Sequence, residues 1–174
     1  IENGGNVVVS SLHHFKTPTH IHIYTANASK HTKFLGRIFS PFGMACEYGY
    51  VDFVSFLIQN KVDPPRYVTM TNDIGTDFEW YYGDKFSPLH IACINNRVEI
   101  CKLFLDSGLD VNILSKERRL SPLSASCVAR HLDIIKLLIQ HLREKGETMT
   151  LLQPLAASCE AGHLDIIKLL IQYG

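Results

Sequence analysis

Apolar residues recur at helical spacing in several segments of the chain. The decamer HLDIIKLLIQ occupies positions 131–140 and again positions 163–172, and a related segment, RVEICKLFLD, occupies 97–106. Their apolar side chains fall largely at intervals of three and four residues, which is typical of a helix with one buried face. An identical decamer that returns at a later position indicates an internal repeat.

Four prolines set the register of this repeat, because each opens a similar run of small and apolar residues. They are Pro41, Pro88, Pro122 and Pro154, and a serine or a glutamine precedes each of them. A serine hydroxyl can cap the first free backbone N–H groups of a helix, and proline suits its first turn. The period is about 33 residues, with a longer interval between the first two copies. We therefore predict four copies, each with one helix that starts near the proline and a second, more apolar helix.

A short break separates the two helices of each copy. Glycine and asparagine tolerate a left-handed turn, and they hold this place as Gly49, Asn96 and Gly162, whereas Arg130 departs from the pattern in the third copy. A helix pair of this size cannot bury its apolar face alone, so neighbouring pairs must stack. The pattern therefore predicts an all-α repeat solenoid of stacked helix-turn-helix units.

The repeat resembles the ankyrin repeat, whose signature is a Thr-Pro-Leu-His start, a Gly-His turn and a Gly-Ala-Asp-Val-Asn exit. The second copy has Ser-Pro-Leu-His at 87–90 and Gly-Leu-Asp-Val-Asn at 108–112, and the fourth copy has Gly162-His163. The other three copies lack the histidine of the start motif. The resemblance covers residues 39–174, which form the predicted ankyrin repeat domain. It implies repeats at about 39–66, 86–114, 120–145 and 152–174, with a long loop at 62–85.

Residues 1–38 do not fit the repeat. Val7–Val9 and Ile21–Tyr24 indicate two short strands, so an irregular segment with a β-hairpin is one interpretation. Thr17-Pro18-Thr19-His20 echoes the start of the repeat, which leaves a degenerate leading repeat or the edge of a preceding domain open. His20 and His22 would share one face of a strand, so a metal-binding module is a further alternative. No cysteine or carboxylate stands beside them at ligand spacing, which favours a polar strand face without metal.

Four of the five cysteines lie at one register position, five residues after each proline. Ankyrin repeats usually have alanine there, and a free cysteine behaves as a small apolar residue. Helix layers stack about 8–10 Å apart, whereas disulfide-bonded Cα atoms lie about 4.4–6.8 Å apart, so we expect free, buried thiols. Such thiols fit an intracellular, cytoplasmic location. The four are Cys46, Cys93, Cys127 and Cys159, and the fifth, Cys101, falls on the apolar side of a second helix.

Composition and charge narrow the function classes. Hydrophobic residues make up 46% of the chain, which is enough for a continuous core, and 17 basic residues balance 17 acidic ones. This balance lacks the basic surplus typical of nucleic-acid or membrane-surface binding, and we interpret the basic residues around Arg118 as a solvated loop. No apolar run approaches the roughly 18 residues that span a bilayer. No phosphate-binding glycine loop, nucleophile elbow or metalloprotease helix is present, so we expect a non-catalytic protein without cofactor or metal.

Two surfaces are candidates for binding a protein partner. The long loop is rich in aromatic side chains, which are enriched at binding hot spots; alternatively, these rings fold back onto the stack. Its candidate residues are Tyr67, Phe78, Trp80, Tyr81 and Tyr82. The ankyrin resemblance implies a second surface at the ends of the first helices, where residues vary from copy to copy. These residues are Glu47, Tyr48, Ile94, Asn95, Val128, Ala129, Glu160 and Ala161.

The sequence therefore predicts a non-catalytic scaffold that binds a protein partner through its concave face and finger loops. The alternative is a structural or regulatory segment of a multidomain protein whose catalytic domain lies outside these residues. The chain begins without methionine and ends at Gly174, where a helix cap would fall. We expect a monomeric piece of a longer chain. We also expect further repeats or a capping element after the fourth copy, which has no polar face to close the stack.

Overall fold

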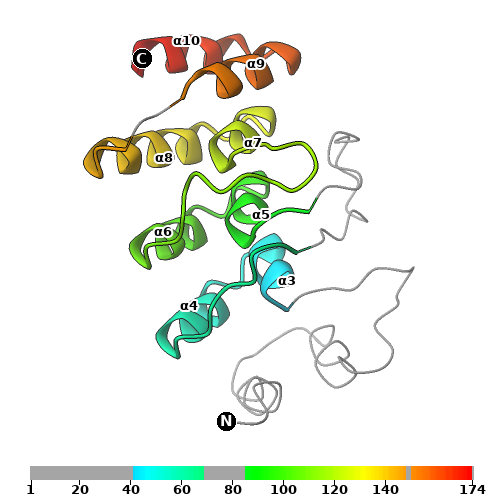
Figure 1. Ribbon diagram of the computed structural model, residues 1–174, viewed down its shortest axis with the longest axis vertical. Helices are drawn as coiled ribbons and strands as arrows, with labels where there is room; N and C mark the ends of the chain where they lie inside the picture. The colour runs from blue at the N-terminus through cyan, green and yellow to red at the C-terminus, as the bar shows by residue number, and fades with distance from the viewer. Residues whose placement is uncertain (1–40, 69–84, 148–149, 174) are drawn as a thin grey trace.

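The computed structural model describes residues 41–68, 85–147 and 150–173. These residues form eight α-helices, arranged as four pairs that follow one another along the long axis of the molecule (Figure 1). The pairs are α3 (Pro41–Tyr48) with α4 (Val51–Gln59), α5 (Pro88–Ile94) with α6 (Val98–Asp106), α7 (Pro122–Val128) with α8 (Leu132–Glu144), and α9 (Leu152–Glu160) with α10 (Leu164–Tyr173).

The first helices of the pairs form one column and the second helices form another (Figure 1). α5 lies between α3 and α7, α7 lies between α5 and α9, and α6 lies between α4 and α8. The described residues contain no strand, only an isolated antiparallel bridge between Val68 and Phe86. The predicted all-α repeat solenoid is confirmed, whereas the β-hairpin proposed for residues 1–38 lies outside the described residues. No described helix is long and apolar enough for a membrane span.

Serine caps begin two of the first helices. The Ser121 hydroxyl accepts a hydrogen bond from the backbone N–H of Ser124 at 3.1 Å, and Ser87 and His90 form a reciprocal capping box. In the fourth copy a glutamine precedes the proline, and α9 begins two residues earlier, at Leu152, without a side-chain cap. Glutamine is a good helix former, and Gln153 lies inside the helix, where its side chain accepts a hydrogen bond from the Ser121 backbone N–H at 3.1 Å.

Left-handed residues turn the chain between the helices of each pair. The backbone φ angles are 82° at Gly49, 55° at Asn96, 60° at Arg130 and 72° at Gly162. Arginine therefore adopts the same turn as the glycines, although a side chain in this conformation costs roughly 1–2 kcal/mol. The Arg130 guanidinium lies 3.3 Å from a carboxylate oxygen of Asp165, an exposed ion pair to the next repeat that offsets only a small part of this cost.

The core runs between the successive helix pairs. Cys46, Cys93 and Cys127 are fully buried at the predicted register position, and all five cysteines are free thiols. Burial raises the pKa of the Cys127 thiol to about 12, against the opposing effect of a hydrogen bond with Ser158. The prediction of a buried thiol is wrong for Cys159, which is exposed. This cysteine lies in the last helix pair, where no described layer covers it.

One hydrogen bond recurs between successive layers. The Arg97 guanidinium donates to the Glu47 carbonyl at 3.0 and 2.8 Å, and two histidines replace it in the next repeats. His131 Nε2 lies 2.9 Å from the Ile94 carbonyl oxygen, and His163 Nε2 lies 3.1 Å from the Val128 carbonyl oxygen. Each acceptor belongs to the last residues of a first helix. A single side chain from each turn therefore fixes the register of one layer on the previous one.

Candidate protein-binding surface

The ends of the first helices carry side chains of different kinds. Tyr48 at the end of α3 is 43% exposed, and its ring stacks on Tyr50 with 6.0 Å between ring centroids. Asn95, which like Tyr48 stands seven residues after the proline of its repeat, is partly exposed. Val128 and Glu160, six residues after their prolines, are partly exposed and exposed at the ends of α7 and α9. The exposed side chains near these helix ends thus change from aromatic to amide, aliphatic and acidic along the stack.

Three of the predicted contact residues are buried. Glu47, Ile94 and Ala129 have exposed fractions of 3%, 7% and 7%. The carbonyls of Glu47 and Ile94 also accept the hydrogen bonds that join successive layers. These three positions were grouped with their neighbours because they vary between copies, but in this structure they offer almost no surface to a partner. Ala161, the last of the predicted set, is partly exposed.

The described ends of the long loop between the first two repeats pair with each other through their backbones. The backbone N–H and C=O groups of Val68 and Phe86 pair at 2.7 and 3.1 Å, and Phe86 is fully buried. Beside this backbone bridge, the Tyr67 hydroxyl donates to the Leu114 carbonyl at 3.2 Å, which places a half-buried ring against the next loop. Tyr67 therefore helps to anchor the loop. The other predicted loop residues, Phe78, Trp80, Tyr81 and Tyr82, lie outside the described residues and stay predictions.

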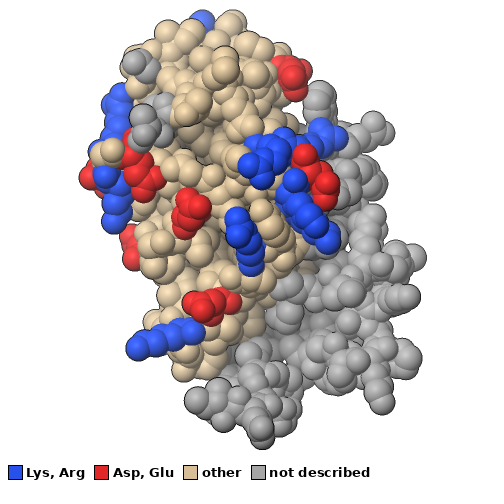
Figure 2. Space-filling model, viewed as in Figure 1, with Lys and Arg blue, Asp and Glu red and all other residues tan. Residues whose placement is uncertain are grey.

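Basic side chains gather at the loop that precedes the third repeat. Lys116, Arg118 and Arg119 are exposed around Glu117, and the backbone N–H of Lys116 donates to the Lys85 carbonyl at 3.0 Å. Figure 2 shows such a gathering of Lys and Arg around acidic side chains on one face of the stack. We call Lys85, Lys116, Arg118 and Arg119 the basic edge. Sequence reasoning found only the three members within residues 116–119, since the contact that adds Lys85 crosses between two repeats.

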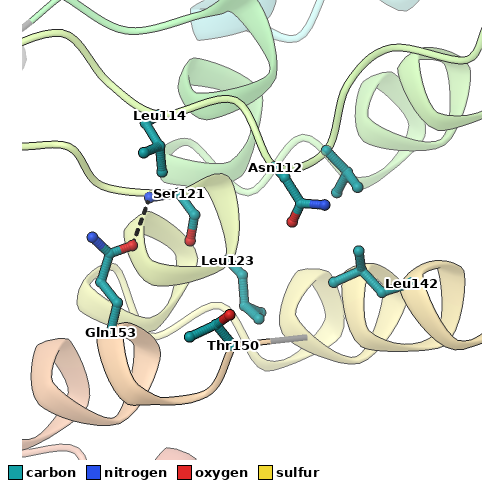
Figure 3. A pocket seen from close by; sticks show the side chains of 8 residues that line it. Asn112, Leu114, Ser121, Leu123, Leu142, Thr150 and Gln153 are labelled. Carbon is teal, nitrogen blue, oxygen red and sulfur yellow. Dashed lines mark hydrogen bonds between the residues drawn. The ribbon is translucent and has the colours of Figure 1, made fainter. Parts of the chain in front are cut away.

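A cavity of about 360 Å³ is lined by residues from the end of the second repeat, from the third repeat and from the start of the fourth. Leu114, Leu123 and Leu142 supply much of its apolar lining, and Figure 3 shows polar groups at its margin. Gln153 there accepts hydrogen bonds from Ser121 and Ser124 and donates to the Arg119 carbonyl at 2.6 Å. Because its amide is already engaged and the lining contains no titratable side chain, the cavity has no group for acid–base or nucleophilic chemistry.

Comparison with known protein families agrees with this architecture. The family model described as ankyrin repeats matches residues 6–115 and 89–174. The chain belongs to the ankyrin repeat family. Ankyrin repeats generally mediate protein–protein interaction, and the family is typically non-catalytic. No curated protein matches the chain.

The described part of the ankyrin stack holds neither a cluster of metal ligands nor an activated buried thiol. Among the residues that the structure describes, no three His, Cys, Asp or Glu side chains cluster so that they could hold a metal ion. The histidines of the N-terminal alternative lie outside that part of the chain. Burial raises the pKa of Cys46 and Cys93 well above the ordinary value, and Cys101 adds to the effect at both. These two thiols therefore stay protonated, and they are poor nucleophiles.

Proposed function

We propose that this ankyrin stack binds a protein partner through the ends of its first helices and the adjacent loop. The exposed Tyr48 at the end of α3, stacked on the partly buried Tyr50 before α4, carries the proposal. Tyrosine is enriched at binding hot spots because a rigid ring supplies a large contact area and its hydroxyl supplies a hydrogen bond. A ring stacked on a second ring is already ordered, so this side chain loses less conformational entropy when a partner binds.

The neighbouring first-helix ends extend this contact along the stack. Asn95, Val128 and Glu160 offer an amide, an aliphatic group and a carboxylate near the ends of the first helices of successive repeats. A partner that lies across these repeats would meet a different group at each layer, which supports selection among partners. The basic edge is a further exposed feature of the stack, and cationic side chains speed association with acidic proteins more than they strengthen the final complex.

The test requires one natural partner, recovered with the immobilised protein from cells that produce it and then purified. Its dissociation constant is measured for wild type, for a Tyr48→Ala, Asn95→Ala double variant, and for a Lys102→Ala, Lys136→Ala control. Both control lysines are exposed on second helices. We expect the first variant to weaken binding by about thirtyfold, or about 2 kcal/mol, and the control to bind as wild type. Equal affinity of the first variant and the control would refute the proposed surface.

The long loop is tested separately with a Trp80→Ala, Tyr81→Ala variant. We expect a loss of affinity of at least tenfold, because truncated hot-spot aromatics commonly cost more than about 1.4 kcal/mol. If this variant binds within twofold of wild type, the loop does not contact the partner and its rings belong to the stack. If both the loop variant and the helix-end variant bind normally, the chain serves a structural role in which these surfaces are not used.

A further inference from the structure

The cavity of about 360 Å³ has an apolar interior and opens to solvent. α8 has 13 residues, whereas α4 and α6 have 9, and Leu142 near the end of this longer helix lines the cavity together with Leu123. Asn112 and Thr150, which also line it, are exposed and mark its mouth (Figure 3). Ligand pockets commonly measure about 300–1,000 Å³, so this cavity suits a group as small as one aliphatic side chain.

A basic loop borders this cavity. Leu114 and Ser121 line the cavity and flank the loop of residues 115–120 in the sequence (Figure 3). Two hydrogen bonds close the loop, from the Ser115 backbone N–H to the Leu120 carbonyl at 2.8 Å and from the Leu120 backbone N–H to the Ser115 hydroxyl at 3.1 Å. A residue spans at most about 3.6 Å, so the backbone of residues 116–119 stays within roughly 7 Å of this closure.

Contacts from other repeats hold the basic loop in one conformation. Gln153, which also lines the cavity, donates from its side-chain Nε2 to the Arg119 carbonyl at 2.6 Å. The backbone φ angle of Arg119 is 59°, a left-handed conformation that persists in such a residue only where its surroundings fix it. The Lys116 backbone N–H donates to the Lys85 carbonyl at 3.0 Å. A loop that is ordered beforehand loses less conformational entropy when a partner binds.

The charge of this loop is strongly positive for its length. Lys116, Arg118 and Arg119 lie on both sides of Glu117, which leaves two more positive than negative charges in a chain with 17 basic and 17 acidic residues. Neither the Lys116 ammonium nor the Arg119 guanidinium forms an ion pair with a carboxylate among the described residues. An apolar cavity with such cations at its border is complementary to an aliphatic group that is flanked by negative charges.

We propose that the cavity and the basic edge together bind a short acidic segment of a protein partner. One aliphatic side chain of the segment enters the cavity, and Asp or Glu residues on either side of it face the basic edge. Residues one or two positions from the inserted side chain lie up to about 7 Å away along the peptide, which matches the reach of the basic loop.

Two other occupants fit less well. A nucleic acid has no aliphatic side chain for the cavity, and Glu117 within the basic loop opposes its phosphates. A fatty acid would fill the cavity, but its single carboxylate would use only part of the basic edge. The inference rests on the proposed function only in taking a protein as the partner, since none of its residues belongs to the surface around Tyr48 and Asn95.

The probe for the test is the peptide acetyl-Glu-Glu-Leu-Glu-Glu-amide, with its dissociation constant measured by isothermal titration calorimetry. One control peptide replaces the leucine by serine, and a second replaces the four glutamates by glutamine. We expect the probe to bind the wild-type protein and each control peptide to bind at least about tenfold more weakly, because each lacks one of the two contacts.

Two variants remove the two contacts from the protein. Thr150→Trp places an indole at the mouth of the cavity, and a Lys116→Gln, Arg119→Asn double variant removes two charges while asparagine tolerates the left-handed backbone. All three side chains are exposed, so the fold should be retained, which circular dichroism checks. We expect each variant to weaken binding of the probe by at least about tenfold. The lysine control and the helix-end variant described above should bind the probe as wild type does.

The helix-end variant also separates this inference from the proposed function. Its loss of the natural partner with normal binding of the peptide shows two independent sites, whereas failure of the peptide to bind overturns this inference alone. Equal affinities of the leucine and serine peptides would also overturn it, since charge attraction would then suffice. So would wild-type affinity of either variant for the probe. Binding of decanoate or of a single-stranded oligonucleotide in place of the peptide would make another class the occupant and contradict the proposal.

Discussion

The decamer shared by the third and fourth repeats offers a matched pair of substitutions, Ile139→Ala and Ile171→Ala. The two isoleucines stand at the same place in ten identical residues, so the two variants change the same local sequence. Ile139 is fully buried and Ile171 is 66% exposed. The difference between the two variants therefore measures what stacking of the next layer contributes to the free energy of unfolding.

The expected values follow from burial. Truncating a fully buried isoleucine to alanine lowers the free energy of unfolding by about 2–5 kcal/mol. Complete burial of an isoleucine is worth about 1.5–3 kcal/mol, so the buried third of Ile171 contributes roughly 0.5–1 kcal/mol. Alanine is a better helix former by a few tenths of a kcal/mol, which offsets part of this loss. We expect Ile171→Ala to cost about 0.5 kcal/mol or less.

The assay is urea unfolding followed by far-ultraviolet circular dichroism, with Ile166→Ala as the control. Ile166 is fully buried in the same helix as Ile171, so its truncation should cost about 2 kcal/mol or more. This control shows that the fourth repeat is folded and contributes to the transition. If Ile171→Ala lowered the free energy of unfolding as much as Ile139→Ala, the reasoning would be refuted, because Ile171 would then be covered in the isolated protein.

Three further predictions concern the turns, a cap and a layer contact. Gly162→Ala should lower the free energy of unfolding by about 1–2 kcal/mol through backbone strain alone, since φ is 72° and a Cβ there would meet nothing within 4 Å; an unchanged urea midpoint would contradict this. Ser121→Ala should cost about 1 kcal/mol in the same assay, because the hydroxyl caps α7, and wild-type stability would refute the cap. Burial lowers the pKa of His131, against the opposing effect of its hydrogen bond with the Ile94 carbonyl. The neutral ring then contributes stability above its ordinary pKa near 6.5, and this stability is lost as the pH falls. Wild type should therefore lose more stability between pH 7.5 and pH 5 than the His131→Gln variant. Equal losses would contradict a buried, neutral His131.

Much of the fold could be predicted from the sequence because the same spacing of proline, turn residue and apolar positions recurs in each repeat. The prolines located the first helices to within two residues, and the left-handed turns fell at the predicted places, including Arg130. Local sequence could not place the start of α9, since Gln153 serves the neighbouring repeat through hydrogen bonds that only the stack brings together. Cys159 was misjudged for a related reason, because burial at its position requires a covering layer and no described helix pair covers it.

The candidate surface was harder to predict than the fold. Variation between copies drew attention to the ends of the first helices, but it did not separate exposed Tyr48 from buried Glu47, which are adjacent in sequence. That separation depends on how a helix is rotated against its neighbours, and a repeat pattern fixes this only approximately. The basic edge was likewise incomplete in the sequence, because Lys85 joins it through a backbone contact between two repeats.

Hydrogen–deuterium exchange of the protein with and without its partner tests the central claim most directly. The account predicts that the partner slows exchange at the turns that follow the first helices, around residues 48–50, 95–97, 129–131 and 161–163, while α4, α6, α8 and α10 exchange as in the free protein. Protection confined to these second helices, with unchanged exchange at the four turns, would contradict it.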